Sequence, residues 1–321
     1  MQRGFAQSEF EQRTARAQGA MLAAGIDALL LTTEADVRYF TGFLTRFWES
    51  PSRPWFLMVP QSGKPVAVIP SIGAALMAQT WIDDIRTWRA PNPQDDGVSL
   101  LAETLNGMGA DVIATPMGYE SNLRMPLADW ARVQTGIRGR IRDDAGIMAG
   151  LRAVKSEAEI AKIEQACAIA GRAFSRVPQI AREGVPLAQV FRDFQRLCLE
   201  EGADWVPYLA GACAFGGYGD VISPASDAPL AAGDVLMLDT GLVWDGYFSD
   251  FDRNFSIGPA APATRDAHAK LIDAVDAGTQ VATAGSTAGQ VFHAMDAIVT
   301  GGAGGSDEGR LGHGLGMQLT E

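Results

Sequence analysis

Two aspartates and one histidine are the side chains of this sequence best suited to chemistry. Asp239 ends the apolar run VLMLD, and Asp250 follows eleven residues later, beyond a tight turn predicted at Asp245-Gly246. An antiparallel hairpin, with Asp250 on the partner strand, would bring both carboxylates onto one face of a sheet. Two like charges in a partly buried place are costly unless a proton or cation offsets them, and carboxylates suit a hard divalent metal.

The residues alone leave a purely structural interpretation equally open. Asp239 could cap a turn, and Asp250 could be a solvated strand residue. His313 lies in LGHGLGM, where flanking glycines allow a ligand to approach closely, as a metal-binding imidazole requires. A lone histidine in a glycine-rich turn is otherwise unremarkable.

The elements that must position these residues are predicted from the hydrophobic pattern. Ser156 and Glu159 predict a capping box at the start of a helix. The inward face of that helix is predicted from apolar residues at steps of three and four: Ile160, Ile163, Cys167, Ala170 and Phe174. Further helices are expected at 264–276 and 287–299, and strands at 235–239, 247–257 and 313–319.

The first half of the chain has a different pattern. Ser8 and Glu11 predict a capping box for a helix that Gly25 can end, and Ala28 to Leu31 fits a buried strand. Apolar runs at 56–59 and 66–69 predict a hairpin, and helix-like stretches lie near 72–80 and 98–107. We therefore expect an α/β domain over residues 1–150 and a second, α+β domain over 155–321.

Composition excludes some partners. The net charge is −12 and no Lys/Arg cluster is present, so a nucleic acid is not an expected partner. The N-terminus has no apolar leader segment, and no run approaches the roughly 18 apolar residues of a membrane span. Three cysteines without metal-site spacing fit reduced thiols. A cytoplasmic protein without a membrane or nucleic-acid partner is the expectation.

The motifs together resemble the M24 or "pita-bread" family, which includes aminopeptidase P, prolidase and creatinase. The resemblance rests on LMLDTG…GYFSDFDRNF and GHGLG, on the helix LRAVKSEAEIAKIEQACAIAG, and on the opening segment GIDALLLTTEADVRYFTGF. It implies a creatinase-like α/β N-terminal domain followed by a pita-bread catalytic domain. It also implies a homodimer.

In that family two divalent metal ions share five ligands, which are two aspartates, one histidine and two glutamates. The resemblance assigns Asp239, Asp250 and His313 to three of these places. The ligand set favours manganese, with cobalt, zinc or iron as alternatives. The implied activity is hydrolysis of an amide bond, such as that of an Xaa-Pro peptide, by a bridging hydroxide with a glutamate as base.

The sequence departs from the family pattern in three places. The two glutamates belong to segments that would follow Glu321, so the catalytic domain is expected to be incomplete and this chain inactive. Ile222 and Thr320 stand where peptidases of the family carry histidines, which favours a small non-peptide substrate of the creatinase or sulfonium-lyase type as an alternative. A binding module without catalysis is a third alternative. Asp252, often threonine in relatives, is expected to pair with Arg253 or to meet a basic substrate group.

Substrate contacts are expected from Arg46, Trp48 and Thr320. In two-domain relatives the N-terminal domain roofs the active site, and Trp48 and Trp55 with Arg46 and Arg53 lie in one loop. An exposed tryptophan and arginine could hold a substrate carboxylate by stacking and bidentate hydrogen bonds. A loop that packs its aromatic residues against the sheet is an equally good interpretation.

Overall fold

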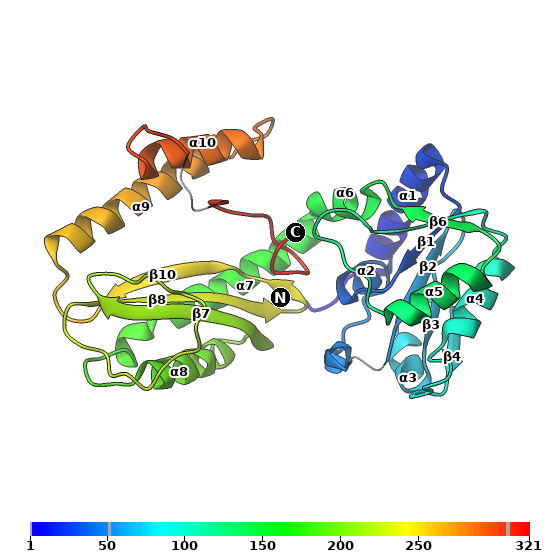
Figure 1. Ribbon diagram of the computed structural model, residues 1–321, viewed down its shortest axis with the longest axis horizontal. Helices are drawn as coiled ribbons and strands as arrows, with labels where there is room; N and C mark the ends of the chain where they lie inside the picture. The colour runs from blue at the N-terminus through cyan, green and yellow to red at the C-terminus, as the bar shows by residue number, and fades with distance from the viewer. Residues whose placement is uncertain (1, 51–52, 306–308) are drawn as a thin grey trace. The chain divides into compact units, whose positions relative to one another are not determined.

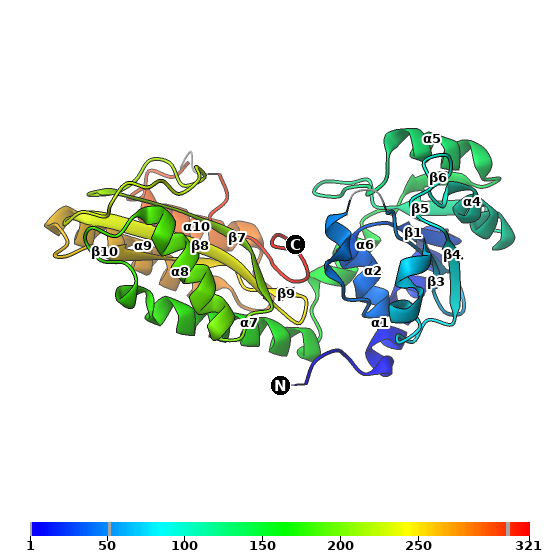
Figure 2. The same ribbon diagram turned by 90° about the horizontal axis from the view of Figure 1, so that it is seen from below.

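The chain forms two compact units in a computed structural model that describes residues 2–50, 53–305 and 309–321. Unit 1 is Met1–Lys155 and unit 2 is Ser156–Glu321. Each unit consists of one sheet with helices packed against it (Figures 1 and 2). No helix in the described part of the chain is long and apolar enough to cross a membrane.

Unit 1 is built on a six-stranded sheet with the order β4-β3-β2-β1-β5-β6. Its strands are β1 (Ala28–Leu31), β2 (Phe56–Pro60), β3 (Val66–Pro70), β4 (Asp84–Trp88), β5 (Val112–Thr115) and β6 (Arg140–Asp143). Its helices are α1 (Gln7–Ala24), α2 (Glu34–Thr41), α3 (Ala74–Met77), α4 (Val98–Gly107), α5 (Leu127–Gly136) and α6 (Ile147–Ala153), with short 3-10 turns η1 (Arg46–Glu49) and η2 (Ser71–Gly73). The predicted hairpin is confirmed, since β2 and β3 pair antiparallel.

The start of α1 and the extent of α3 differ from the sequence prediction. Gly25 ends α1 in the left-handed conformation, as predicted. The capping box at Ser8 is wrong, because α1 begins at Gln7 and its N-cap residue, Ala6, makes no side-chain cap. Likewise only Ala74–Met77 forms an α-helix within the predicted stretch 72–80.

Unit 2 places two helices against one face of a four-stranded sheet with the main path β10-β8-β7 (Figure 2). Its strands are β7 (Trp205–Phe215), β8 (Asp234–Trp244), β9 (Tyr247–Phe248) and β10 (Phe251–Ser256). Its helices are α7 (Glu157–Ser175), α8 (Leu187–Glu200), α9 (Pro262–Val281) and α10 (Ala288–Val299), with a 3-10 turn η3 (Val177–Gln179).

The core of unit 2 lies between the sheet and helices α7 and α8. Phe174 and Phe194, with ring centroids 4.8 Å apart, pack there against Leu236, Leu238 and Leu242 of β8. The strand alternates, so the odd-numbered residues of β8 point to the opposite face. That opposite face is where the charged residues lie.

Two predictions for unit 2 need correction. The capping box of Ser156 and Glu159 is confirmed, and Ala170 and Phe174 are buried as predicted, but the first part of the predicted inward face of α7 is displaced by about one residue. Ile160 is exposed, while the face buried in the structure carries Glu159, Lys162, Ala166, Ile169, Ala170, Ala173 and Phe174. The predicted strand at 313–319 is absent, since that described segment consists of bends and irregular backbone. Alternating glycines at 312, 314 and 316 account for this, because glycine disfavours strands.

Candidate metal centre

Strand β8 carries Asp239 at its middle. It is the one residue of this strand that is only partly buried. Because neighbouring side chains on a strand point to opposite faces, Leu238 and Thr240 point to the other face. The hydroxyl of Tyr208 on β7 donates a hydrogen bond of 3.1 Å to Asp239 Oδ2. Asp239 is therefore held on the face of the sheet away from α7 and α8.

Asp252, and not Asp250, is the direct cross-strand neighbour of Asp239. The register of β8 and β10 pairs Asp239 with Asp252, and Asp250 lies just before β10 begins at Phe251. The expected position of Asp250 on the partner strand is thus corrected, since Asp250 lies one residue before that strand begins. Because residues two apart share a face, all three carboxylates lie on the same side of the sheet.

The predicted pairing of Asp252 with Arg253 is also absent. The Arg253 guanidinium lies over the Phe251 ring, 4.6 Å from its centroid, and donates to the backbone oxygen of Asp252. The Asp252 side chain is exposed. Its carboxylate therefore adds negative charge to the face that already carries Asp239.

His313 reaches this face from the terminal segment. Its Nε2 lies 3.2 Å from Asp250 Oδ2, and the side chains of His313 and Asp250 are 27% and 10% exposed. Its Nδ1 lies 2.9 Å from the backbone oxygen of Gly314. A carbonyl oxygen can only accept, so Nδ1 carries the hydrogen and Nε2 faces the carboxylate. A backbone partner of this kind commonly orients a metal-binding histidine.

The pKa values of the two aspartates reflect this crowding. Burial, followed by the negative charges of Asp239 and Asp252, raises the pKa of Asp250 to about 6, although nearby His313 opposes the rise. Burial also raises the pKa of Asp239, against the hydrogen bond from Tyr208. The pKa of Tyr208 itself is raised to about 12 by burial and by Asp239. Ionising both aspartates without a cation is therefore unfavourable at this site.

The donor types fit a hard divalent cation. A cation would offset the like charges that raise the aspartate pKa values, and carboxylate with imidazole is a common donor set for such ions. Among the described residues, no three His, Cys, Asp or Glu side chains lie close enough together to form a complete metal site. The structure thus brings Asp239, Asp250 and His313 to one face without a closed ligand shell.

The expected substrate-binding residues of unit 1 lie in a packed loop. Trp48 is 7% exposed, with its ring centroid 5.6 Å from that of Trp55, so the expected exposed tryptophan is corrected to a buried one. Arg124 stacks on Trp48 and donates hydrogen bonds to the backbone oxygens of Trp48, Ser50 and Arg53. Arg46 is half-exposed and pairs with Glu49. In unit 2, Thr320 is partly buried in the segment that also carries His313.

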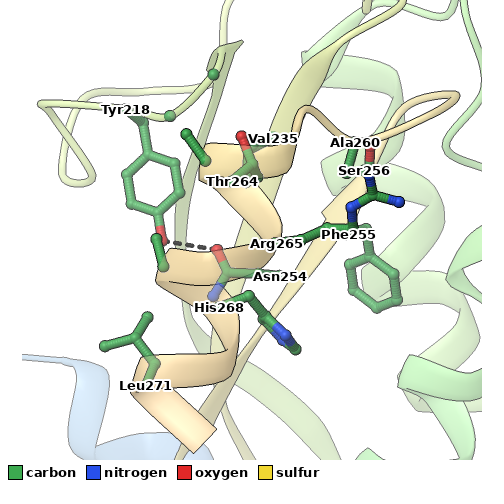
Figure 3. Close-up of a pocket in the computed structure, with 14 residues that line it drawn as sticks. Tyr218, Val235, Asn254, Phe255, Ser256, Ala260, Thr264, Arg265, His268 and Leu271 are labelled. Carbon is green, nitrogen blue, oxygen red and sulfur yellow. Dashed lines mark hydrogen bonds between the residues drawn. The ribbon is translucent and has the colours of Figure 1, made fainter.

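A pocket of about 530 Å³, which was not predicted from the sequence, lies beside Asn254 of β10, and its lining includes none of Asp239, Asp250, Asp252 or His313. Asn254, two residues beyond Asp252, accepts a 2.7 Å hydrogen bond from the Tyr218 hydroxyl, and His268 and Leu271 of α9 complete the wall (Figure 3). Burial and the charge of Asp252 raise the pKa of Tyr218. The alternation of β10 could have placed Asn254 beside the aspartates, but nothing local in the sequence indicated Tyr218.

Known proteins match both units. Residues 161–321 match the profile of metallopeptidase family M24, and residues 13–154 match that of the creatinase/prolidase N-terminal domain. An uncharacterized peptidase, YqhT of Bacillus subtilis, is 26% identical over 310 residues, which cover 92% of this chain and 80% of that protein. Dipeptidase PepE from Mycobacterium ulcerans superposes with a TM-score of 0.81 at 26% identity, covering 99% and 83% of the two chains. An Xaa-Pro dipeptidase from Bacillus anthracis gives a TM-score of 0.83 at 20% identity, covering 97% and 83%.

Proposed function

Because the chain belongs to metallopeptidase family M24 and has a creatinase/prolidase N-terminal domain, we propose that it is a metal-dependent peptidase that hydrolyses Xaa-Pro peptides. The observation that carries the proposal is the contact of His313 with Asp250 on the sheet face that also carries Asp239 and Asp252. Imidazole and carboxylates in contact, with raised carboxyl pKa values, are typical of a cation site.

Asp239, Asp250 and His313 would hold two divalent ions, with manganese first and cobalt, zinc or iron as alternatives. Such ions supply Lewis acidity, which polarises a carbonyl and lowers the pKa of water. The protein's own contribution is orientation. Tyr208 holds one oxygen of Asp239, and Gly314 fixes the ring nitrogen of His313 that faces Asp250. Each contact restrains one side chain that would bind the ions.

The substrate class is supported by the related structures. Two proteins with superposable structures are a dipeptidase and an Xaa-Pro dipeptidase. Arg46, Trp48 and Thr320 remain part of the proposal as substrate contacts. Contact through Trp48 requires the packed loop of unit 1 to open, whereas the half-exposed Arg46 is already accessible.

The test is hydrolysis of Xaa-Pro dipeptides and tripeptides by protein first treated with EDTA and then supplied with Mn²⁺ or Co²⁺. For a protein that also supplies the two glutamate ligands of the family, cleavage that is lost with EDTA and restored by Mn²⁺ is the expected result. A matched peptide with alanine in place of proline serves as the specificity control. Tight Mn²⁺ binding without cleavage of any peptide would count against the peptidase and in favour of a binding module.

A small non-peptide solute is the second candidate substrate. Ile222 and Thr320 supply no imidazole beside the site, and the Ile222 side chain is 84% exposed in the loop after Tyr218. Proton transfer to a peptide leaving group would lack the usual histidines, which favours a substrate that does not need them. Release of product from small amides, with none from Xaa-Pro peptides, would support this candidate. Gel filtration with light scattering tests the accompanying proposal of a homodimer.

A further inference from the structure

Two charged residues are buried on helix α7, on the side that packs against the sheet. Glu159 and Lys162 are each only 3% exposed, one turn apart. Burying such charges costs several kcal/mol unless each finds a partner. Among their partners are Asp245, Trp244 and Tyr247, at the turn between β8 and β9.

Two residues of α7, Lys162 and Glu159, contact the turn. Lys162 Nζ forms a buried ion pair with Asp245 Oδ2 and lies 5.6 Å from the centroid of the Trp244 ring. The Tyr247 hydroxyl donates a 2.9 Å hydrogen bond to Glu159 Oε1, whose other carboxylate oxygen accepts the Ser156 backbone N–H. The helix cap and the turn are thereby joined through one carboxylate.

The backbone of the turn is fixed as well. Asp245 and Gly246 have φ values of 48° and 81°, as expected for a two-residue hairpin turn with left-handed residues. The Asp245 backbone N–H donates a 2.7 Å hydrogen bond to Asp204 Oδ2. The turn therefore has contacts on its side chains and on its main chain.

The residues that follow the turn lead directly to the candidate metal centre. The Phe248 N–H donates a 2.8 Å hydrogen bond to the Gly316 oxygen, in the segment that carries His313. The Ser249 N–H donates a 2.9 Å hydrogen bond to the Leu242 oxygen, and Asp250 comes next. The two-residue strand β9 thus has Tyr247 bound to α7 and Phe248 bound to the histidine segment.

We propose that Glu159 and Lys162 are positioning residues for the metal centre. They hold the Trp244–Tyr247 turn against α7. The turn then fixes Asp250 and His313 relative to Asp239. Neither residue touches the site, so neither is a catalytic residue. This inference rests on the proposed function, because it assumes that Asp239, Asp250 and His313 bind metal.

A purely stabilising role predicts something different. If the contacts only stabilise unit 2, their loss lowers the melting temperature, while the folded protein binds metal with unchanged affinity. If they position the ligands, the affinity of the folded protein falls, because ligand orientation determines metal affinity. Metal affinity and ligand geometry therefore separate the two roles.

The experiment compares Tyr247→Phe and Lys162→Met with the unaltered chain, using Mn²⁺ titration calorimetry and Co²⁺ absorption spectra. Arg172→Met is the matched control, since Arg172 lies on α7 and pairs with Glu201 at the surface, away from the turn. We expect the Mn²⁺ Kd to rise by about 10- to 100-fold in Lys162→Met and less in Tyr247→Phe, with altered Co²⁺ bands, because contacts that orient metal ligands have effects of this size. Arg172→Met should match the unaltered chain.

Three results decide the matter. An unchanged Kd and Co²⁺ spectrum in folded Tyr247→Phe and Lys162→Met, with only a lower melting temperature, would overturn the inference while leaving the proposed function intact. Failure of the unaltered chain to bind Mn²⁺ or Co²⁺ would overturn the proposed function and this inference with it. If Lys162→Met does not fold, Tyr247→Phe decides, because it removes a single hydroxyl.

Discussion

In unit 1 the strands β1 and β3 are buried along their whole length, whereas in unit 2 the strand β10 is largely exposed on one face. Continuous burial means that helices and loops cover both faces of the first sheet. The second sheet packs α7 and α8 on one face only, and its other face carries Asp239 and Asp252. The comparison teaches that the carboxylates of unit 2 gather on the sheet face opposite the one that α7 and α8 cover.

The strongest test of this comparison is to remove a proposed metal ligand from the sheet face of unit 2 that carries the carboxylates. Asp250→Asn should weaken Mn²⁺ binding by at least about 100-fold, since it deletes a charged ligand and even contacts that merely orient ligands contribute 10- to 100-fold. Asp266→Asn, an exposed position on α9, is the matched control and should bind as the unaltered chain does. Calorimetric titration measures both. Equal affinities in the two variants would remove Asp250 from the ligand set.

Core substitutions test whether each unit depends on its own packing. Phe194→Ala in unit 2 and Phe56→Ala in unit 1 remove rings that are fully buried. Each should lower the free energy of unfolding of its own unit by about 3–5 kcal/mol. Differential scanning calorimetry should show the loss, and the Mn²⁺ Kd of folded Phe56→Ala should stay unchanged. A raised Mn²⁺ Kd in Phe56→Ala would mean that the packing of unit 1 affects metal binding in unit 2.

The loop of unit 1 offers a smaller test. Arg124→Met removes three hydrogen bonds to the backbone oxygens of Trp48, Ser50 and Arg53 but keeps much of the side-chain volume. We expect a loss of about 1–3 kcal/mol, the usual cost of leaving buried polar groups unpaired. Chemical denaturation measures the stability. Cleavage of Xaa-Pro peptides in the same variant would show a changed KM if the loop contacts substrate.

The smallest expected effect is the pH dependence of the metal-free protein. The pKa of Asp250 is about 6 in the folded chain, above its ordinary value of 3.8. The folded state therefore holds this proton more tightly than the unfolded state. The resulting contribution to the free energy of unfolding is present below about pH 4 and is lost as the pH rises through about 6. Melting in EDTA should occur at a lower temperature at pH 7 than at pH 5. Asp250→Asn should flatten this part of the profile, and a profile unchanged by that substitution would refute the assignment.

Much of the fold could be predicted from local patterns. The resemblance to family M24 and the expected two-part fold are confirmed by the matching profiles and by the superposable structures. The Ser156 capping box and the hairpin of β2 and β3 were accessible because each depends on a few neighbouring residues. Elements of this kind carry their own signal in the sequence.

Two of the failures share a cause, since both depended on residues distant in the sequence. The inward face of α7 was misplaced because Glu159 and Lys162 count as outward-facing in a hydrophobic pattern, yet their partners Tyr247 and Asp245 lie more than eighty residues away. The pairing of Asp239 with Asp252 depends on where β10 resumes after the turn, which local periodicity does not specify. For the candidate site, the sequence indicated the residues and the tertiary structure determines their neighbours.

The hydrogen bond from His313 to Gly314 has a consequence for any ion that arrives. Rotating the imidazole by half a turn would point a carbon at the carbonyl and break the 2.9 Å contact, so the ring has little freedom left to lose. The entropy of orienting this donor is therefore spent when the chain folds and not when the ion is captured. Because metal ligands bind in their deprotonated form, the uptake of metal should release protons into the solvent.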